Sequence, residues 1–405
     1  MKFLHTSDWH VGKTLKGHSR LDEQRDVLAE IVGIARDHAV DAVLIAGDLY
    51  DSSAPGAEAQ KILTGALLAL ADSGTQVLAM AGNHDHPGLL DAYRPLAGHA
   101  GITLIGQPRA VDDGGVVTFT ARSTGERVNV AVLPFLSQRY AVKAADLLTH
   151  TPAEQAGNYE TQIRELLDYL TSGFTSDAVN LVMAHLTVTG GVLGGGERSA
   201  QTIFDYYVPA AAFGSAPHYV ALGHLHRRQT LPANCPVAYS GSPVCVDFGE
   251  QDNTPTVVVV EVSPTTPATT TDITIAAGRR MRTVRGTVAD LTARAADFGN
   301  DWLRVYVTEP ARAGLRDDIL TELPNALDIR IDPDYAQSVS RQATARPDRS
   351  PSELFADYCA ERGVDDARVR ALFDELHDTL TSPDTCACDL TVPAAPTTTK
   401  TGTGA

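Results

Sequence analysis

Side chains that bind metals or transfer protons follow several short apolar runs in the first part of the chain. The runs cover residues 2–7, 42–46, 77–81, 180–184 and 219–222, and aliphatic or β-branched runs of this length bounded by glycine indicate buried strands. The polar residues that end or follow these runs are Asp8, His10, Asp48, Asn83, His185, His224 and His226. Because ligands collect beyond the carboxyl ends of strands in an open sheet, we expect these side chains to meet at one edge.

The chemistry of this set favours a pair of catalytic metal ions. Imidazole, carboxylate and amide donors without a thiolate suit Mn, Fe or Zn better than a closed structural zinc site. Seven ligands are too many for one ion that must also leave a position open for substrate. Two ions about 3.5–4 Å apart that share a bridging carboxylate can activate a water and stabilise both oxygens of a phosphoryl displacement.

His84 is a further histidine of these motifs that is not needed as a ligand for such a metal pair. It follows the candidate ligand Asn83 directly, so we expect it at the rim of the site, facing the substrate. A histidine in that place can protonate a leaving oxygen near neutral pH. Single motifs are weak signals, because Asp-x-His occurs by chance and Gly-Asp after a strand is often only a turn. The interpretation depends on all of the motifs following strands in one chain.

The order D-x-H, G-D, G-N-H-D, H and G-H-x-H resembles the calcineurin-like metallophosphoesterases, and every motif of that pattern is present. Residues 4–13, 46–51, 81–85 and 239–243 further resemble motifs of the SbcD/Mre11 nuclease family. The resemblance covers residues 1–262 well. It implies an α/β fold with a layered β-sandwich metallophosphoesterase core flanked by helices, plus a small α+β cap domain and C-terminal helices.

The resemblance also assigns roles to the motif residues. It implies one ion bound by Asp8, His10, Asp48 and His226, and a second bound by Asp48, Asn83, His185 and His224, with Asp48 as the bridge. His84 becomes the catalytic histidine, and Asp51 orients it through a hydrogen bond unless Asp51 is only a turn or capping residue. Mn²⁺ is the expected metal, with Mg²⁺ and Fe as alternatives.

Length and composition set the outer limits. The chain has 405 residues and 43% hydrophobic residues, and no apolar run reaches the ~18 residues of a membrane span. A cleaved signal peptide would remove Asp8 and His10, so we expect none. The five cysteines lack C-x-x-C spacing, which fits a reducing cytoplasm. We therefore expect a cytoplasmic, nucleoid-associated protein.

The formal net charge of −17 argues against strong nucleic-acid binding by this chain alone, because lysine and arginine supply most of the affinity for DNA. Basic residues nevertheless cluster beside the first and last motifs. The candidate DNA contacts are Lys13, Lys16, Arg20, Arg227 and Arg228, and each could equally be a solvated surface residue. A partner should therefore supply much of the grip on DNA.

Patterning divides the chain into five parts. Residues 1–264 form the expected nuclease domain, and a Pro/Thr-rich connector at 263–271 leads to a cap domain at 279–335. A polar linker at 336–350 precedes a helical segment at 351–380, and residues 381–405 form an expected disordered tail. A Gly-rich stretch at 190–196 is expected to be a flexible loop near His185.

The helical segment at 351–380 is too short to bury a core of its own. Its apolar residues should bind a partner, and the resemblance implies the coiled coil of an SMC-like ATPase (SbcC type). The partner-facing residues are Leu354, Phe355, Tyr358, Leu372, Phe373 and Leu376. Helices around 62–70 and 89–93 are expected to form a homodimer, which gives a heterotetramer with the ATPase. The resemblance implies a two-metal DNA phosphodiesterase with ATP-dependent exonuclease action on duplexes and endonuclease action on single strands, as the catalytic subunit of a double-strand-break and hairpin processing complex. The competing hypothesis is a phosphatase or phosphodiesterase that acts on a small molecule or a phosphoprotein.

Overall fold

The computed structural model describes residues 1–137, 141, 144, 159–197, 207–336, 350–364 and 366–381. It divides into two units, Met1–Asp332 and Pro333–Ala405, and each is described by itself. The expected linker at 336–350 and the tail at 381–405 lie almost entirely outside the described residues. None of the described helices is long and apolar enough to span a membrane.

The first sheet has the strand order β16-β15-β1-β4-β5-β6. Its strands are β1 (Lys2–Thr6), β4 (Ala42–Ile45), β5 (Gln76–Met80), β6 (Ile102–Ile105), β15 (Thr256–Ser263) and β16 (Thr266–Thr274). Strands β1, β4, β5 and β6 run parallel, and β15 pairs antiparallel with β1.

The expected connector at 263–271 was wrong, because most of it belongs to β16. This strand pairs antiparallel with β15 from Thr256↔Thr274 to Ser263↔Thr266. Its threonines are β-branched and favour a strand. Pro267 is tolerated because β16 lies at the edge of the sheet, where a missing N–H costs no ladder bond.

The second sheet has the order β13-β14-β12-β9-β8-β7. Its strands are β7 (Val116–Thr120), β8 (Arg127–Leu133), β9 (Val179–His185), β12 (Tyr219–Gly223), β13 (Gln229–Leu231) and β14 (Val237–Tyr239). Strands β8, β9, β12 and β14 run parallel, so their carboxyl ends lie at the same edge.

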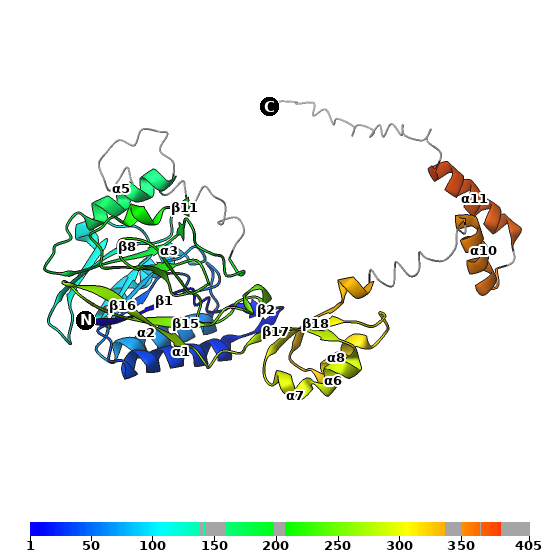
Figure 1. Ribbon diagram of the computed structural model, residues 1–405, viewed down its shortest axis with the longest axis horizontal. Coiled ribbons are helices and arrows are strands. Elements are labelled where there is room, and N and C mark those ends of the chain that lie inside the picture. Colours follow the sequence, from blue (N-terminus) through cyan, green and yellow to red (C-terminus); the bar gives the residue numbers. More distant parts are fainter. Residues whose placement is uncertain are drawn as a thin grey trace, which may run out of the picture. The chain divides into compact units, whose positions relative to one another are not determined.

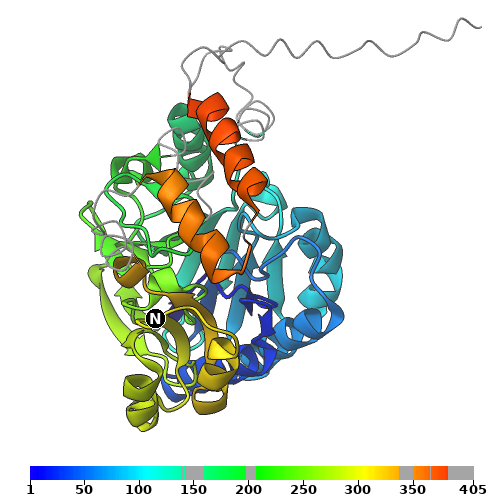
Figure 2. The same cartoon turned by 90° about the vertical axis from the view of Figure 1, so that its right-hand side faces the viewer.

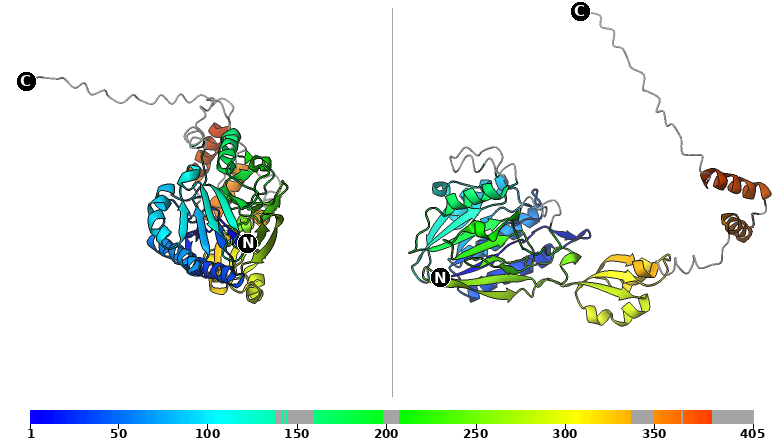
Figure 3. Two further views of the ribbon diagram at one scale, coloured as in Figure 1. Left: turned by 90° about the vertical axis from the view of Figure 1, so that its left-hand side faces the viewer. Right: turned by 45° about the horizontal axis from the view of Figure 1, so that its top comes forward.

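The two sheets pack face to face between two layers of helices (Figures 1 and 3). Helices α1 (Leu21–Asp37), α2 (Ala57–Ala71) and α3 (Pro87–His99) pack on the first sheet, and α5 (Tyr159–Thr171) packs on the second. Alternation along β1 separates the two sides. Leu4 packs with the helices, whereas Phe3 packs between the sheets beside Tyr219. The structure confirms the expected layered α/β core.

A small domain follows the first sheet in the chain. It contains β17 (Met281–Gly286), α6 (Val288–Ala293), α7 (Ala295–Phe298), β18 (Trp302–Val307), α8 (Leu315–Glu322) and β19 (Ala326–Ile331). The three strands are parallel, and a separate apolar core that includes Leu291, Phe298 and Val305 holds the helices on them. A capping box between Thr287 and Asp290 begins α6.

The second unit contains a helical hairpin, α10 (Pro351–Glu361) and α11 (Ala367–Thr381), coloured orange to red in Figure 2. Ser350 and Glu353 form a capping box at its start. The two helices meet through Phe355 and Phe373, whose rings stack with centroids 4.0 Å apart.

Short elements complete the described part of the chain. They are β2 (Thr14–Leu15), β3 (His18–Ser19), β10 (Thr187–Val188), β11 (Tyr207–Val208), and the 3₁₀ turns η1 (Val111–Asp113), η4 (Ala210–Phe213) and η5 (Phe248–Glu250). The turn η5 contacts β17, so it lies where the small domain meets the core.

Candidate metal centre

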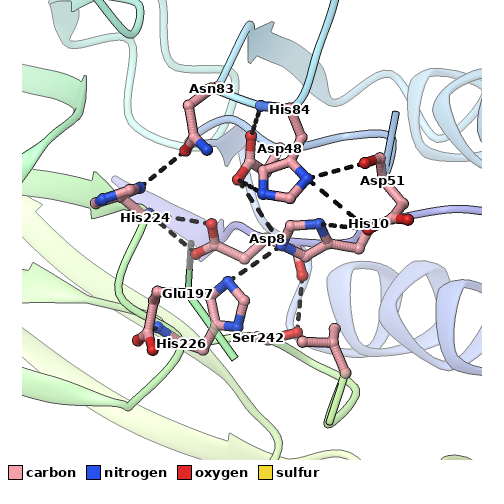
Figure 4. Close-up of polar contacts among 12 residues, drawn as sticks. Asp8, His10, Asp48, Asp51, Asn83, His84, Glu197, His224, His226 and Ser242 are labelled. Atoms are coloured by element: carbon pink, nitrogen blue, oxygen red, sulfur yellow. Dashed lines mark hydrogen bonds and ion pairs between the residues drawn. The ribbon is translucent and has the colours of Figure 1, made fainter. Parts of the chain in front are cut away.

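The strands that the sequence predicted to carry ligands end at one place in the structure. Thr6 of β1 is in register with Ile45 of β4, and Gly223 of β12 is in register with His185 of β9. The ends of these strands and the loops after them bring all seven candidate ligands together. Figure 4 shows the side chains of Asp8, His10, Asp48, Asn83, His224 and His226 converging. Six of the seven are buried, and Asn83 is half-buried.

Glycines let the two sheets approach each other at this point. A Cβ at position 223 would lie 1.9 Å from the Ala46 carbonyl oxygen, and one at position 47 would lie 2.3 Å from His185 Nδ1. Gly47 also has a backbone φ of +94°, which residues other than glycine rarely adopt. The approach lets His185 Nδ1 donate across the sandwich to the Ala46 carbonyl at 2.8 Å. His185 Nε2 is thereby directed into the site.

Three side chains form the first group of donors. Asp8, His10 and His226 each offer an atom within 4.8 Å of the others. His10 Nε2 and His226 Nε2 lie only 3.1 Å apart. Two buried imidazole nitrogens that face each other this closely need a cation between them or a proton on one of them.

The second group of donors gathers around Asn83. Its Oδ1 lies 2.9 Å from His185 Nε2 and 2.8 Å from His224 Nδ1. Asp48 stands between the two groups, because its Oδ2 is 3.5 Å from His185 Nε2 and 3.8 Å from His10 Nε2. This is the position that a bridging carboxylate requires.

Unfavourable backbone conformations concentrate at the ligands. Among the described non-glycine residues, six have positive φ, and four of these are Asp8 (55°), His10 (46°), Asp48 (52°) and His224 (104°). Such conformations cost of order 1–3 kcal/mol each and persist only where the surroundings enforce them. The loops are thus held in shapes that direct these side chains inward.

Hydrogen bonds from neighbouring segments fix Asp8. Ser7 Oγ donates to Asp8 Oδ2 at 2.6 Å, and the main-chain N–H of His224 donates to Asp8 Oδ1 at 3.0 Å. Ser242 Oγ donates to the Asp8 carbonyl at 2.7 Å, and Ser240 Oγ lies 2.8 Å from Ser7 Oγ. The Ser-Gly-Ser segment after β14 therefore supports the first ligand of the chain.

His84 lies inside the site rather than at its rim, since it is only 7% exposed. Its Nδ1 is 2.9 Å from the main-chain carbonyl of Asp51, and its Nε2 is 4.0 Å from Asp48 Oδ2. The Asp51 carboxylate, expected to orient His84, is 3.8 Å from Nδ1 and pairs with Lys13 at 3.0 Å instead. The orienting contact therefore comes from the main chain of Asp51.

Three carboxylates near the site were missed by the sequence analysis. Glu250 pairs with His226 Nδ1, and Glu197 accepts the main-chain N–H of His226 at 3.0 Å. Asp85 accepts the main-chain N–H groups of Gly82, Leu49 and Tyr50, and so ties the loops after β4 and β5 together. Only Asp85 had a sequence signal, because it ends the Gly-Asn-His-Asp motif.

The Gly-rich stretch at 190–196 lies against His226 rather than only near His185. A Cβ at position 194 would be 2.8 Å from His226 Cβ, and one at position 196 would be 2.0 Å from Glu250 Oε1. Glycine is required at both positions because no side chain fits between this segment and the site.

The structure corrects two of the expected DNA contacts. The Arg20 side chain is fully buried and bonds to Glu23 and the Cys245 carbonyl, so it cannot reach DNA. Arg228 is 14% exposed and is held by Asp272 at 2.8 Å. Lys16 pairs loosely with Asp328 at 3.8 Å, and Arg227 is exposed.

Burial and mutual attraction shift the pKa values of the site in opposite directions. Burial disfavours the imidazolium of His185, but the Asp48 and Asp8 carboxylates and the Ala46 carbonyl together raise the pKa of His185 to about 9. Burial acts likewise on His226, and the Glu250 carboxylate raises its pKa to about 10. Burial also acts on Asp48, but the His185 imidazole holds its pKa well below the usual range. Positive charge is therefore stabilised on His185 and His226, whereas burial lowers the pKa of His224 to about 3 and holds the pKa of His10 well below its usual value.

A pair of divalent metal ions fits this donor set. The Nε2 atoms of His10 and His226 face each other, and the Asn83 oxygen lies between two imidazole nitrogens. At each of these two places a bound cation would be coordinated by the nitrogen and oxygen atoms that now face one another. Each place combines imidazole with a hard oxygen donor, which suits Mn, Fe or Zn. Asp48 lies within reach of both places.

Comparison with known proteins agrees with this chemistry. The profile of the calcineurin-like phosphoesterase family matches residues 1–228, which include all seven ligands. The SbcD component of nuclease SbcCD from Bacillus subtilis (strain 168) is 37% identical over 283 residues, 69% of this chain and 71% of that protein. The same component from Rhodobacter capsulatus is 36% identical over 62% of this chain and 64% of its own length. The same component from Escherichia coli (strain K12) is 27% identical over 396 residues, which are 94% of this chain and 89% of that protein.

Metal binding should release protons, because His185 and His226 carry them at pH 7 in the metal-free protein. Both pKa values lie above 7, and a metal binds only the neutral imidazole. We expect about two protons released when both sites fill at pH 7, and an apparent affinity that rises with pH until both histidines are neutral. Calorimetric titration with Mn²⁺ in buffers of different ionisation enthalpy measures this release. An enthalpy that does not depend on the buffer would contradict it.

Proposed function

We propose that this chain, which belongs to the calcineurin-like phosphoesterase family and to the SbcD nucleases within it, cleaves DNA at the metal centre. It is a metal-dependent nuclease, and the finer proposal is ATP-dependent exonuclease action on duplexes together with endonuclease action on single strands. The observation that carries the proposal is the convergence of seven candidate metal ligands, six of them buried, with His84 beside them. We further propose that it acts in the cytoplasm on nucleoid DNA.

The residues of the site have separable roles. Bound divalent ions would supply Lewis acidity to activate a water and to stabilise negative charge on the phosphate. Asp8, His10, Asp48 and His226 would hold one ion, and Asp48, Asn83, His185 and His224 the other. Mn²⁺ is the proposed metal, with Mg²⁺ and Fe as alternatives, because the site combines nitrogen with carboxylate and amide oxygen.

His84 is proposed to protonate the leaving oxygen. Donation from Nδ1 to the Asp51 carbonyl leaves Nε2 facing the site, where it can carry the proton that is transferred. The Asp48 carboxylate, 4.0 Å from Nε2 and accepting the main-chain N–H of His84 at 2.8 Å, holds the residue beside the reacting phosphate. Lys13, paired with Asp51 at the same edge, and the exposed Arg227 are proposed to contact the DNA backbone.

Replacing His84 with alanine should abolish cleavage and leave both metals bound. Loss of a general acid costs roughly 10²- to 10⁴-fold in rate. The measurement is the nuclease rate on single-stranded DNA with Mn²⁺, together with bound manganese by elemental analysis. Asp48→Ala is the matched comparison, because loss of the bridging carboxylate should lower manganese occupancy at both positions. If His84→Ala lost its metals as well, His84 would be a ligand, and its role as the proton donor would be wrong.

The helical hairpin is proposed to bind the coiled coil of an SMC-like ATPase. Leu354, Tyr358, Leu372 and Leu376 are each more than half exposed, although they are large and apolar. Phe355 and Phe373 pack on each other inside the hairpin, so they support its shape rather than facing a partner as expected. An exposed apolar stripe on a helix pair suits a helix-in-groove contact.

Truncation after Arg346 should separate catalysis from partner binding. The shortened protein should keep its two metals and its cleavage of short single strands, because all seven proposed metal ligands lie between Asp8 and His226. It should lose co-purification with the ATPase and ATP-dependent duplex degradation. The intact chain carrying Leu354→Asp and Leu372→Asp is a matched variant, and it should show the same losses. Unchanged affinity of the truncated protein for the ATPase would refute the proposed contact.

A homodimer through α2 and α3 is also proposed, and with the ATPase it would form a heterotetramer. Most apolar residues that suggested this interface belong to the protein's own core, since Ile62, Leu67 and Leu90 pack on the first sheet. The surface that remains contains Leu68, 46% exposed, and Leu96, 72% exposed. The proposal therefore depends on these two leucines.

Leu96→Glu should convert the dimer to a monomer if α3 lies in the interface. In a dimer interface the glutamate would be buried without a partner, which opposes association strongly. In the single chain position 96 is exposed, so the same substitution should affect folding little. Light scattering at micromolar protein concentration measures the mass of the wild type and the variant. Leu193→Glu, at an exposed leucine outside both helices, is the control and should stay dimeric. A monomeric wild-type protein would refute the dimer.

A further inference from the structure

We propose that Glu250 is a positioning residue that holds the imidazole of His226 with Nε2 directed at the first metal position. The inference rests on the proposed two-metal site and adds a residue that does not itself touch metal or substrate. Glu250 lies 24 residues beyond His226, in the turn η5, and its side chain is 1% exposed.

Both carboxylate oxygens of Glu250 are used. Oε1 lies 2.5 Å from His226 Nδ1, and Oε2 accepts the main-chain N–H of Val246 at 2.7 Å. His226 Nδ1 must therefore carry a proton, which leaves Nε2 as the atom that faces His10 Nε2. A carboxylate that fixes the tautomer of a metal-binding histidine raises the basicity of the ligand and fixes its orientation.

Only a carboxylate can satisfy both donors. In a glutamine at position 250, one of the two oxygens becomes an NH₂ group, which can only donate. If that group faced Val246, two donors would meet in a buried place. If it faced His226, Nδ1 would have to accept, and the proton would move to Nε2, the atom needed for the metal. The requirement for two acceptors distinguishes this role from simple filling of space.

The segments around Glu250 hold it at this distance. The Gly194–Gly196 backbone packs against Glu250 and His226 so closely that a Cβ at position 196 would overlap the carboxylate. Glu197 at the end of the same segment accepts the main-chain N–H of His226 at 3.0 Å. His226 is therefore held by one carboxylate on its side chain and by another on its main chain.

The small domain supports the segment that carries Glu250. The Arg304 guanidinium of β18 lies over the Phe248 ring, 4.6 Å from its centroid, and the Thr283 N–H donates to Gln251 Oε1 at 3.0 Å. On the other side, the buried Arg20 donates to the Cys245 carbonyl. Residues 245–251 are thus held between the start of α1 and strands β17 and β18 of the small domain, and these contacts fix the position of the Glu250 carboxylate.

The test compares Mn²⁺ binding by the full-length wild type with that of three variants, using calorimetry and elemental analysis. Glu250→Gln should weaken one of the two manganese sites by about 10- to 100-fold and leave the other unchanged. Glu250→Asp keeps two acceptors and should retain more affinity than Glu250→Gln, although it is shorter. Asp247→Asn lies in the same turn, still caps Gly249, and should bind both ions as the wild type does.

Two results would overturn the inference: two-site binding by Glu250→Gln at wild-type affinity, or weaker binding by Glu250→Asp than by Glu250→Gln. If Glu250→Gln fails to fold, the wild type decides. Its imidazole ¹⁵N shifts with Zn²⁺ bound, assigned with a His226→Asn variant, should show a protonated Nδ1 on His226 and a metal-bound Nε2. The reverse arrangement would refute the role of Glu250. A wild type that binds no metal would instead refute the proposed function.

Discussion

The metal centre depends on the close approach of the carboxyl ends of two sheets. Packed sheets normally lie about 10 Å apart, but at Gly223 and Gly47 the separation leaves no room for a Cβ. Without this approach, Asp48 from the first sheet and His185 from the second could not lie 3.5 Å apart. Away from this edge the described interior between the sheets is mostly apolar, and the buried His5 there is hydrogen-bonded to Tyr219 and the Leu222 carbonyl. The ionisable cluster therefore sits where the strands end and the loops begin.

A second constraint is the cost of burying so many ionisable groups together. Isolated charges in an apolar interior are expensive, so they must be paired or bind a metal. In the metal-free protein the pairing is internal, because the imidazolium of His185 offsets the charge of Asp48. Two divalent ions in place of about two protons would raise the charge of the cluster by about two, and the buried carboxylates of Asp8 and Asp48 are placed to offset it. The same arrangement therefore explains why the cluster is stable when folded and why metal and protons compete for it.

The sequence predicted which polar residues converge because each ends or follows a buried strand, and strand ends can be read from local patterns. It did not predict the residues that contact these side chains from distant segments of the sequence. Glu250 and Glu197 reach His226 from segments 24 and 29 residues away, and no spacing rule connects them. Arg20 was expected to be a surface cation, because the local sequence does not reveal that its side chain is buried between Glu23 and the distant Cys245 carbonyl. The strand β16 was missed because proline and threonine resemble a connector unless the pairing with β15 is known.

The internal pairing of cations bears on how such an acidic protein can bind DNA. Affinity for DNA depends on lysines and arginines that are free to neutralise phosphates. Arg20 and Arg228 are committed to contacts within the protein, and Lys13 is shared with Asp51. The free positive charge beside the site is therefore smaller than the sequence suggests, within a chain of net charge −17. Divalent ions bound by the cluster would add positive charge only at the site itself, so they would favour catalysis more than binding along the DNA. On the proposed function, stable binding of long DNA therefore requires a further positively charged surface. The proposed partner of the exposed apolar stripe on α10 and α11 is the protein that would supply it.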